Sequence, residues 1–357
     1  MKKELKLMKG NEALAEAVIR AGCDGYFGYP ITPQSEILEY LTEHAFRKTG
    51  MVVLQAESEV ASINMIYGAA GTGKKVMTSS SSPGISLMQE GISYIACAEL
   101  PCLLVNVMRG GPGLGTIQPS QGDYFQTVKG GGHGDYRLIT LAPSTVQEMV
   151  DFVKLGFDLA FKYRNPVMIL ADGALGQMME KVELFEAIPR SNEIPEWATV
   201  GKPKTRERNI ITSLHMEPEK MEEINNHLQK KYKEIDNNEI RYEMIDCDDA
   251  EIVLVAFGLV ARICTKAAHL AREKGIKVGV FRPISLFPYP YEQISKLSEK
   301  VKGMFVVEMN AGQMVEDVRL AVNGKIPVEF HGRMGGIVPT PEEILLKLEE
   351  KFSGVTL

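Results

Sequence analysis

The chain has few cysteines, and none of the five has the spacing that a metal or redox motif requires. No C-x-x-C pair, the spacing typical of iron–sulfur clusters and structural zinc, occurs among Cys23, Cys97, Cys102, Cys247 and Cys264. An odd number of scattered thiols is typical of a reducing cytoplasm, where they behave as small apolar side chains. We therefore expect a cytoplasmic protein with no metal site of its own, and any redox centre on another chain.

Other signals are missing as well. No apolar run is long enough to span a bilayer, and the first residues, MKKELKLMKG, lead into no apolar signal segment. Lys and Arg number 40 against 46 Asp and Glu, so the net charge of −6 gives no basic surface for nucleic acid. The G-x-S-x-G and H-E-x-x-H motifs are also absent. These absences exclude membrane, nucleic-acid and common hydrolase classes from our expectations.

Two glycine-rich segments resemble nucleotide-binding loops but depart from them. Residues 68–74 nearly fit the Walker A pattern, yet Lys75 follows where magnesium binding needs Ser or Thr. Residues 110–115 resemble a dinucleotide fingerprint, but Pro112 breaks its spacing. We interpret the first as a helix end and the second as a loop at the carboxyl end of a strand.

Residues 1–180 alternate between β-rich runs and helical stretches, which predicts a parallel sheet covered by helices. We expect strands at 26–29, 52–55, 75–79, 102–108, 137–141 and 167–171, and helices at 11–21, 33–48, 60–70, 85–98 and 146–163. Residues 181–249 are rich in Lys, Glu and Asn and predict a charged connector with one solvated helix at 218–235. A second, smaller α/β domain is expected at 250–357, with strands at 251–258, 277–283, 304–310 and 328–332.

Three helix starts carry capping signals. Thr32 is the expected N-cap of the helix at 33–48, and Pro33 is its expected first residue, a position where proline is common. Ser144 and Gln147 have capping-box spacing, and Thr340 stands before a proline and two acids.

Polar segments lie at the predicted carboxyl ends of strands, the edge where open α/β sheets bind ligands. They comprise 28–33 (GYPITP), 55–59 (QAESE), 79–84 (SSSSPG) with 86–90, 109–113 (RGGPG), and 121–123 (QGD) with 133–136 (HGDY). In this order they resemble the α subunits of the 2-oxoacid:ferredoxin oxidoreductases, above all of members that act on branched-chain 2-oxoacids such as 3-methyl-2-oxobutanoate. The resemblance covers most of residues 8–180 and, less densely, 250–350, where 308–310 with 312–313 is also similar.

The resemblance implies a fold and an activity. The fold is an α/β thiamine-diphosphate-binding domain of the pyrimidine type, followed by a smaller domain similar to the C-terminal domain of transketolases. The activity is coenzyme-A-dependent oxidative decarboxylation of the 2-oxoacid to an acyl-CoA and CO₂, with ferredoxin as electron acceptor. The family implies a β subunit that supplies the magnesium and diphosphate site, a γ subunit and a ferredoxin-like subunit, with iron–sulfur clusters on the partners.

Site roles follow from the resemblance, position by position. Glu59 corresponds to the carboxylate that hydrogen bonds to the aminopyrimidine ring of thiamine diphosphate. Thr32 corresponds to a residue that faces the 2-oxoacid, and Arg109 to the arginine that binds the substrate carboxylate. His133 is a further substrate candidate. The cofactor-contact candidates are Pro30, Ser80, Ser81 and Ser82, and the sequence does not tell which serine of 79–82 makes the contact.

The physical demand on Glu59 is independent of the family. The 4′-amino group of thiamine deprotonates the thiazolium carbon only when the pyrimidine adopts its imino form, which a carboxyl group removed from water favours by sharing a proton with N1′. Helical spacing places Glu59 on one face with Ile63, Ile66 and Ala70, whereas Glu57 turns away from that face. Non-catalytic interpretations of these residues remain open. Glu59 could be a solvated acid at a helix start, and Thr32 could serve only as a helix cap. Arg109 could be an exposed loop residue, and His133 could have a structural role.

Three alternatives remain at this point. A 2-oxoglutarate enzyme would need a second cation for the dicarboxylate, with Lys129 or His133 as candidates. Two departures weaken that assignment: Ser82 stands before the Pro-Gly pair where the 2-oxoglutarate members commonly have glycine, and the segment Ala56-Glu57-Ser58-Glu59 stands where they tend to have the acid-rich M-E-D-E. The other two alternatives are a non-catalytic assembly homologue and a Rossmann-type nucleotide-binding protein. The exact 2-oxoacid, the oligomeric state, the coenzyme A contacts and the physiological direction are not predicted.

Overall fold

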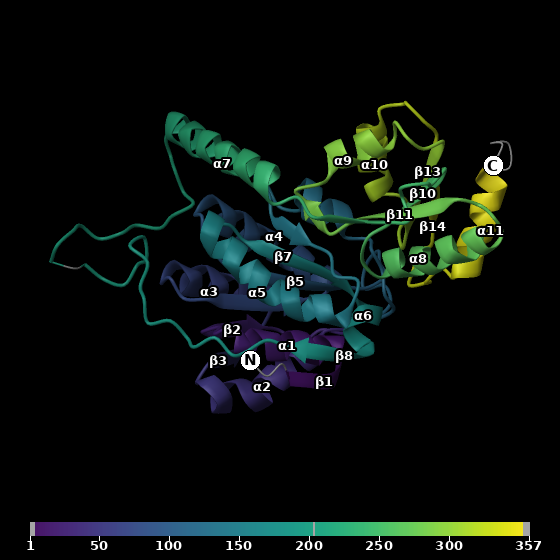
Figure 1. The fold of residues 1–357 in the computed structure, drawn as a ribbon. Helices are drawn as coiled ribbons and strands as arrows, with labels where there is room; N and C mark the ends of the chain where they lie inside the picture. Colours follow the sequence, from purple (N-terminus) through teal and green to yellow (C-terminus); the bar gives the residue numbers. More distant parts are fainter. Residues whose placement is uncertain (1–3, 203, 353–357) are drawn as a thin grey trace.

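A seven-stranded sheet forms the centre of the first half of the chain in the computed structural model, which describes residues 4–202 and 204–352 (Figure 1). Its strand order is β12-β6-β7-β5-β4-β2-β3. All neighbours run parallel except β12, which pairs antiparallel with β6. The strands are β2 (Gly25–Gly28), β3 (Val52–Gln55), β4 (Val76–Ser80), β5 (Leu103–Met108), β6 (Ile139–Leu141), β7 (Val167–Asp172) and β12 (Ser285–Phe287). The predicted parallel sheet is confirmed.

Helices cover both faces of this sheet, because its central strands are buried throughout and have two apolar faces. One face packs against α1 (Gly10–Arg20), α2 (Ser35–Thr49) and α5 (Val146–Tyr163). The other face packs against α3 (Glu59–Gly71) and α4 (Ser82–Cys97). Shorter elements complete this half: α6 (Gly173–Gln177), the π-helix η1 (Gln126–Gly130), and the antiparallel pair β1 (Glu4–Lys9) and β8 (Met179–Leu184).

A five-stranded sheet forms the second half, with strand order β14-β13-β10-β11-β9. Its strands are β9 (Tyr242–Ile245), β10 (Ile252–Val255), β11 (Val278–Pro283), β13 (Gly303–Glu308) and β14 (Val328–Gly332), of which only β9 is antiparallel. Helices α8 (Gly258–Glu273) and α11 (Pro341–Phe352) share one core with this sheet. Helices α9 (Tyr291–Leu297) and α10 (Met314–Val322) belong to the other face. The predicted second α/β unit is confirmed.

The two sheets share one hydrophobic core, so the halves of the chain are joined by packing as well as by the connector. Leu104 and Met168 of the first sheet lie in the same buried cluster as Val253, Phe281 and Met304 of the second. Strand β12 adds a covalent link, because it follows β11 of the second sheet and extends the first. The second half therefore supports the first half directly.

The segment between the sheets is an extended arm followed by a long helix. The arm (185–202 and 204–217) first runs along the body, where the Ile188 N–H donates to the Arg20 carbonyl (2.7 Å) and Ala198 is buried, and part of it then projects from the body in Figure 1. Helix α7 (Pro218–Asn238) returns to pack Leu228, Tyr232 and Ile235 against the core. The sequence predicts the helix but no strand in this region, whereas β8 ends and β9 lies within it. The expected domain boundaries at 180 and 250 stay a prediction.

Capping is confirmed at one predicted helix start and shifted at another. Thr340 accepts a hydrogen bond from the Glu343 N–H (3.2 Å) at the start of α11. At α5 the capping box is one residue later than predicted, since Thr145 accepts from the Glu148 N–H (3.1 Å) and Glu148 reaches back to the Ser144 N–H (2.7 Å). Ser144 and Gln147 are therefore not the capping pair. No helix within the described ranges is both long and apolar enough to cross a membrane.

Candidate active site

The carboxyl ends of β2, β3, β4 and β5 bring most of the predicted site residues to one edge of the first sheet. Glu59 is the first residue of α3, directly after β3. Ser58 caps that helix by accepting from the Ala61 N–H (3.1 Å). The Glu59 side chain is only 6% exposed, and it has no hydrogen-bond or ion-pair partner among the described residues. Ile63, Ile66 and Ala70 are buried on the same helix face, as predicted, while Glu57 is exposed.

Helix α4 approaches the Glu59 carboxylate closely because residue 84 is a glycine. A Cβ on Gly84 would lie 2.1 Å from Ser80 Oγ and 2.7 Å from Glu59 Oε1. Ser80 and the Glu59 carboxylate therefore lie on either side of the same small space at the start of α4. Any side chain at residue 84 would enter that space.

The four serines 79–82 have different surroundings. Ser79 donates to the Gln34 amide oxygen (2.6 Å) and is hydrogen bonded to the Tyr26 hydroxyl (2.8 Å). Ser82 is hydrogen bonded to the backbone of Arg109. Ser80 and Ser81 are fully buried, and their hydroxyl oxygens have no partner. Buried polar groups are normally hydrogen bonded, so these two hydroxyls, unlike those of Ser79 and Ser82, are candidates for contact with a bound molecule.

Arg109 lies beside Thr32 at this edge. Its guanidinium donates to the carbonyl oxygens of Thr32 (2.9 Å) and Leu114 (3.0 Å), and its buried Nε has no partner. The Ser82 hydroxyl accepts from the Arg109 N–H (3.1 Å) and donates to its carbonyl (3.2 Å). The structure thus brings Thr32, Ser82 and Arg109 together, with Pro30 exposed on the same β2–α2 segment.

The prediction that Thr32 caps α2 is wrong. The helix begins at Ser35 after Gln34, and Thr32 lies in an exposed turn. Tertiary contacts override the local capping signal: the Asn11 amide donates to the Pro33 carbonyl (2.7 Å), and the buried Gln34 side chain is held by Ser79. The Thr32 hydroxyl is therefore not committed to a helix N–H.

The structure places His133 and Lys129 away from Arg109. His133 is exposed and lines a separate cavity of about 110 Å³ with Tyr94 and Cys97. Lys129 forms an ion pair with the buried carboxylate of Asp317 on α10. Neither side chain lines the cavity next to Arg109.

That cavity, of about 410 Å³, lies between the two halves of the chain. Ser82, Arg109 and Asp123 line it from the first half, and Asn310 and Gln313 from the second. Asp123 ends the polar segment 121–123, but the sequence alone assigns it no individual role. Burial raises the pKa of the Asp123 carboxyl, and hydrogen bonds from Ser82 and Asn106 offset only part of that effect. An asparagine inside the otherwise apolar run LLVNVM is a signal that could have drawn attention to this place.

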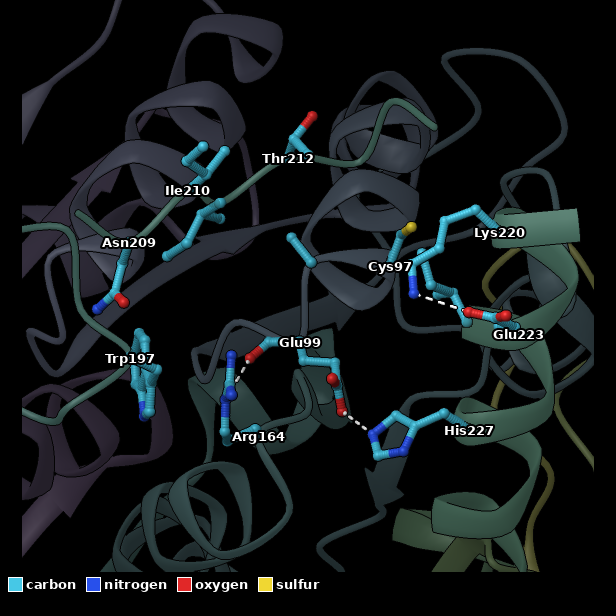
Figure 2. A pocket seen from close by; sticks show the side chains of 13 residues that line it. Cys97, Glu99, Arg164, Trp197, Asn209, Ile210, Thr212, Lys220, Glu223 and His227 are labelled. Atoms are coloured by element: carbon cyan, nitrogen blue, oxygen red, sulfur yellow. Dashed lines mark hydrogen bonds and ion pairs between the residues drawn. The ribbon is translucent and has the colours of Figure 1, made fainter. Parts of the chain in front are cut away.

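A larger cavity, of about 560 Å³, lies elsewhere, where the arm and α7 meet the C-terminal end of α4 (Figure 2). Its charges are mostly paired with one another. Glu99 binds His227 and Lys231, each at 3.0 Å, and Lys220 binds Glu223 at 2.8 Å. None of the predicted site residues lines this cavity. In the described residues no three His, Cys, Asp or Glu side chains gather as a metal site requires.

Replacing Glu99 by glutamine is expected to destabilise the fold by about 1–3 kcal/mol, because it leaves the buried Lys231 ammonium without its counterion. Burial alone would raise the pKa of Glu99, but Lys231 and His227 outweigh it and lower the pKa below the ordinary value. The pKa of Lys231 is lowered too, since loss of hydration outweighs the ion pair there. The stabilisation by Glu99 is present above its unfolded-state pKa and disappears as pH falls through the lower folded-state pKa.

Thermal denaturation of wild type and Glu99→Gln from neutral to acidic pH measures this effect. The two melting temperatures should converge as the pH falls. Glu223→Gln, which removes an exposed ion pair, is the matched control and should change little. A constant difference at every pH would contradict the ion-pair explanation.

Comparison with known proteins places these features in context. Residues 16–245 match a family model described as the thiamine-diphosphate-binding domain of pyruvate flavodoxin/ferredoxin oxidoreductases. Residues 250–344 match a model of core domain II of pyruvate:ferredoxin oxidoreductase. The ketoisovalerate oxidoreductase subunit VorB of Methanothermobacter thermautotrophicus is 50% identical over 345 residues, which cover 97% of both chains.

Two solved structures are similar in fold. A 2-oxoglutarate:ferredoxin oxidoreductase from Magnetococcus marinus superposes with a TM-score of 0.87 at 28% identity. The match covers 98% of this chain but only 65% of that one, so this chain spans about two thirds of its length. A split-gene transketolase superposes with a TM-score of 0.61 at 14% identity, over 97% of this chain and 98% of that chain, which shows likeness of fold alone.

Proposed function

The chain belongs to the 2-oxoacid:ferredoxin oxidoreductase family, and we propose that it supplies the pyrimidine half of a thiamine diphosphate site for oxidative decarboxylation of a branched-chain 2-oxoacid. The family membership confirms the resemblance that the ordered polar segments indicated. The proposed products are an acyl-CoA and CO₂, with electrons passing to ferredoxin. The observation that carries the proposal is a carboxylate, Glu59, that is buried without a partner at the ligand-binding edge of a thiamine-diphosphate-binding domain.

The residues around Glu59 fit the aminopyrimidine ring. When bound, thiamine diphosphate would supply the nucleophilic carbon that attacks the 2-oxo group. Glu59 would hydrogen bond to the ring nitrogen N1′, in surroundings where little water competes for its oxygens. The unpartnered hydroxyls of Ser80 and Ser81 would hydrogen bond to the ring or its substituents. Among the serines we therefore favour 80 and 81 over Ser82, which already bonds to Arg109.

Arg109 and Thr32 would hold the substrate. A guanidinium can grip a carboxylate through two parallel hydrogen bonds and so orient the 2-oxo group. The Arg109 side chain now donates to two backbone carbonyls, and a substrate carboxylate would replace one or both as the stronger acceptor. The Thr32 hydroxyl, which caps no helix, would be available to the substrate. Pro30 would contribute to the wall of the site from the same segment.

Partner subunits complete the proposed enzyme. The family resemblance assigns the magnesium and diphosphate site to a β subunit and iron–sulfur clusters to partner chains, together with a γ subunit and a ferredoxin-like subunit. The five cysteines of this chain are all free thiols, and none has cluster spacing. Coenzyme A would enter the assembled complex.

The substrate class rests on similarity and on the placement of cations. The relative described as a ketoisovalerate oxidoreductase subunit is 50% identical, whereas a 2-oxoglutarate synthase subunit KorA of Methanocaldococcus jannaschii is 38% identical and the solved 2-oxoglutarate enzyme 28%. A dicarboxylate needs a second cation near Arg109, but Lys129 is paired with Asp317 and His133 lines another cavity. We therefore favour 3-methyl-2-oxobutanoate over 2-oxoglutarate.

Turnover by the reconstituted complex tests this choice. We expect a kcat/KM at least about tenfold higher with 3-methyl-2-oxobutanoate than with 2-oxoglutarate, because the dicarboxylate would bury an unpaired charge worth at least about 1.4 kcal/mol. Ferredoxin reduction measures both rates. Equal or higher kcat/KM with 2-oxoglutarate would contradict the assignment.

Gly84→Ala tests the cofactor fit. The added methyl group would overlap Ser80 Oγ and press on Glu59 Oε1, so we expect thiamine diphosphate to bind at least about tenfold more weakly. The helix itself should tolerate alanine, which has a higher helix propensity than glycine. Gly68→Ala in α3 is the matched control, because nothing lies within 4 Å of its added Cβ. Unchanged cofactor affinity in Gly84→Ala would remove this space from the cofactor site.

A further inference from the structure

Asp123 is a carboxyl group in the cavity beside Arg109 that the functional assignment leaves unused. It lines that cavity together with Ser82 and Arg109. Its Oδ2 accepts from the Asn106 amide (2.8 Å), and the Ser82 hydroxyl is its other side-chain partner. A carboxyl group has about four lone-pair sites, so these two neutral partners leave capacity on the cavity side.

Strand β5 supplies a buried hydrogen-bond partner for Asp123, Asn106. Asn106 lies in β5, whose neighbours Leu104 and Met108 on the same strand face are core residues. Asn106 is fully buried, and its amide oxygen has no partner. A buried amide in a sheet core is costly unless it serves a specific contact. The contact that Asn106 makes is the hydrogen bond to Asp123.

The second half of the chain fixes the loop that carries Asp123. One side chain, Gln313 at the start of α10, spans it: Gln313 Nε2 donates to the Gly122 carbonyl (2.8 Å), and Gln313 Oε1 accepts from the Phe125 N–H (2.8 Å). Gln121 and Met309 exchange two further hydrogen bonds of 3.0 Å each. The position of Asp123 in the cavity therefore depends on the second domain.

Gln313 is itself held by a buried carboxylate. Glu308, fully buried at the end of β13, accepts from the backbone N–H groups of Met314 (2.9 Å) and Val315 (3.0 Å) and from the Asn310 amide (2.8 Å). Glu308 also accepts from the Gln313 N–H (3.3 Å), so these contacts fix both the first turn of α10 and its N-cap residue, Gln313.

We propose that Asp123 is a further substrate-binding residue, whose carboxyl group hydrogen bonds to the 2-oxoacid beside Arg109, and that Gln313 of the second domain is the positioning residue that holds it there. The inference rests on the proposed function, because it takes Arg109 as the group that binds the substrate carboxylate. It gives the second half of the chain a part in the substrate site in addition to its packing against the first half.

The chemistry favours a neutral Asp123 when substrate is bound. A second anion beside Arg109 would repel the substrate carboxylate and compete for the guanidinium. A protonated carboxyl group instead donates one hydrogen bond and adds no charge. Burial raises the pKa of the Asp123 carboxyl, which shifts its titration toward that form. The substrate would then meet a cation and a neutral donor on adjacent parts of the same cavity.

Steady-state kinetics of the reconstituted complex test the inference, with 3-methyl-2-oxobutanoate as the probe. Asp123→Ala is expected to raise KM about 10–100-fold, with a smaller change in kcat and unchanged thiamine diphosphate content. Asp123→Asn keeps a donor of similar size and should stay within about fivefold of wild type. An unchanged KM in Asp123→Ala overturns the substrate contact, and an equal loss in both variants overturns the neutral-donor role.

A double-mutant cycle tests Gln313. Gln313→Ala should raise KM about 3–10-fold, but add nothing in the Asp123→Ala background, because it acts only through Asp123. Gln313→Glu can still accept from Phe125 but cannot donate to Gly122, so it should fall between wild type and Gln313→Ala. Additive effects in the double variant would show general destabilisation and overturn the positioning role. Glu316→Gln, exposed one turn later on α10, is the control and should behave as wild type.

Turnover by the wild-type complex distinguishes failure of the proposed function from failure of the roles proposed for Asp123 and Gln313. If the wild-type complex uses no 2-oxoacid, the proposed function is wrong and the inference falls with it. If the wild type turns over while Asp123→Ala and Gln313→Ala match it, only the inference is wrong.

Discussion

Glu59→Gln is expected to reduce turnover of the reconstituted complex by about 10²–10⁴-fold, the range typical of losing a positioned proton-transfer group. Glutamine has nearly the same size, so the apolar face formed with Ile63, Ile66 and Ala70 stays filled. Its amide, however, cannot share a proton with a ring nitrogen as a carboxyl group does. Because Glu59 has no hydrogen-bond partner in the described chain, the fold should lose little stability. The loss should therefore appear in kcat at wild-type melting temperature.

Glu57→Gln is the matched control for this variant. Glu57 lies two residues earlier, is exposed, and turns away from the buried face of α3. It should keep wild-type turnover and cofactor content. If Glu59→Gln turned over at the wild-type rate, the chain would be an assembly homologue, which is the alternative that the sequence left open.

Arg109→Ala is expected to lower kcat/KM for the 2-oxoacid by about 30–3,000-fold, corresponding to about 2–5 kcal/mol for truncating one partner of a desolvated charge pair. Its guanidinium is the cation that lines the cavity between the two halves of the described chain. Arg109→Lys should recover only part of the loss, because an ammonium group cannot form the two parallel bonds of a guanidinium. Initial rates over a range of substrate concentrations, at saturating coenzyme A and ferredoxin, separate KM from kcat.

Two results would contradict this role for Arg109. One is an Arg109→Ala variant with the wild-type KM, and the other is complete recovery by lysine. Arg47→Ala, on the exposed side of α2, is the control for loss of a positive charge and should leave both constants unchanged. Thiamine diphosphate content should remain at the wild-type level in all three variants.

The sequence predicted the elements whose signal is local. Nearly continuous apolar runs at β5 and β7 identified strands buried on both faces, and α5 was predicted with its observed bounds. It missed β1, β8, β9 and β12. Each of these pairs antiparallel at an edge with a distant segment, and β12 has only three residues, so no local periodicity marks it. Such strands form because of their pairing with distant segments, which the local sequence does not indicate.

In the site too, the sequence predicted the features that depend on one element and missed those that depend on contacts between distant segments. The helical period placed Glu59 on the buried face of α3, because that property depends on α3 alone. The capping signal failed at Thr32, because Asn11 and Ser79 hold the following residues from elsewhere in the fold. The surroundings of Ser80 and Ser81 also required the structure. So did the link between Asp123 and Gln313, which lie 190 residues apart.

The most direct test of the proposed cofactor site is an experimental structure of the assembled complex with thiamine diphosphate bound, in which the distance from the Glu59 carboxylate to N1′ of the pyrimidine is measured. We predict a hydrogen bond of about 2.6–3.2 Å, with the Ser80 or Ser81 hydroxyl in contact with the ring and Arg109 facing the thiazolium side. A pyrimidine ring bound elsewhere, with the Glu59 side chain turned into solvent, would contradict the proposed role of Glu59 in cofactor binding.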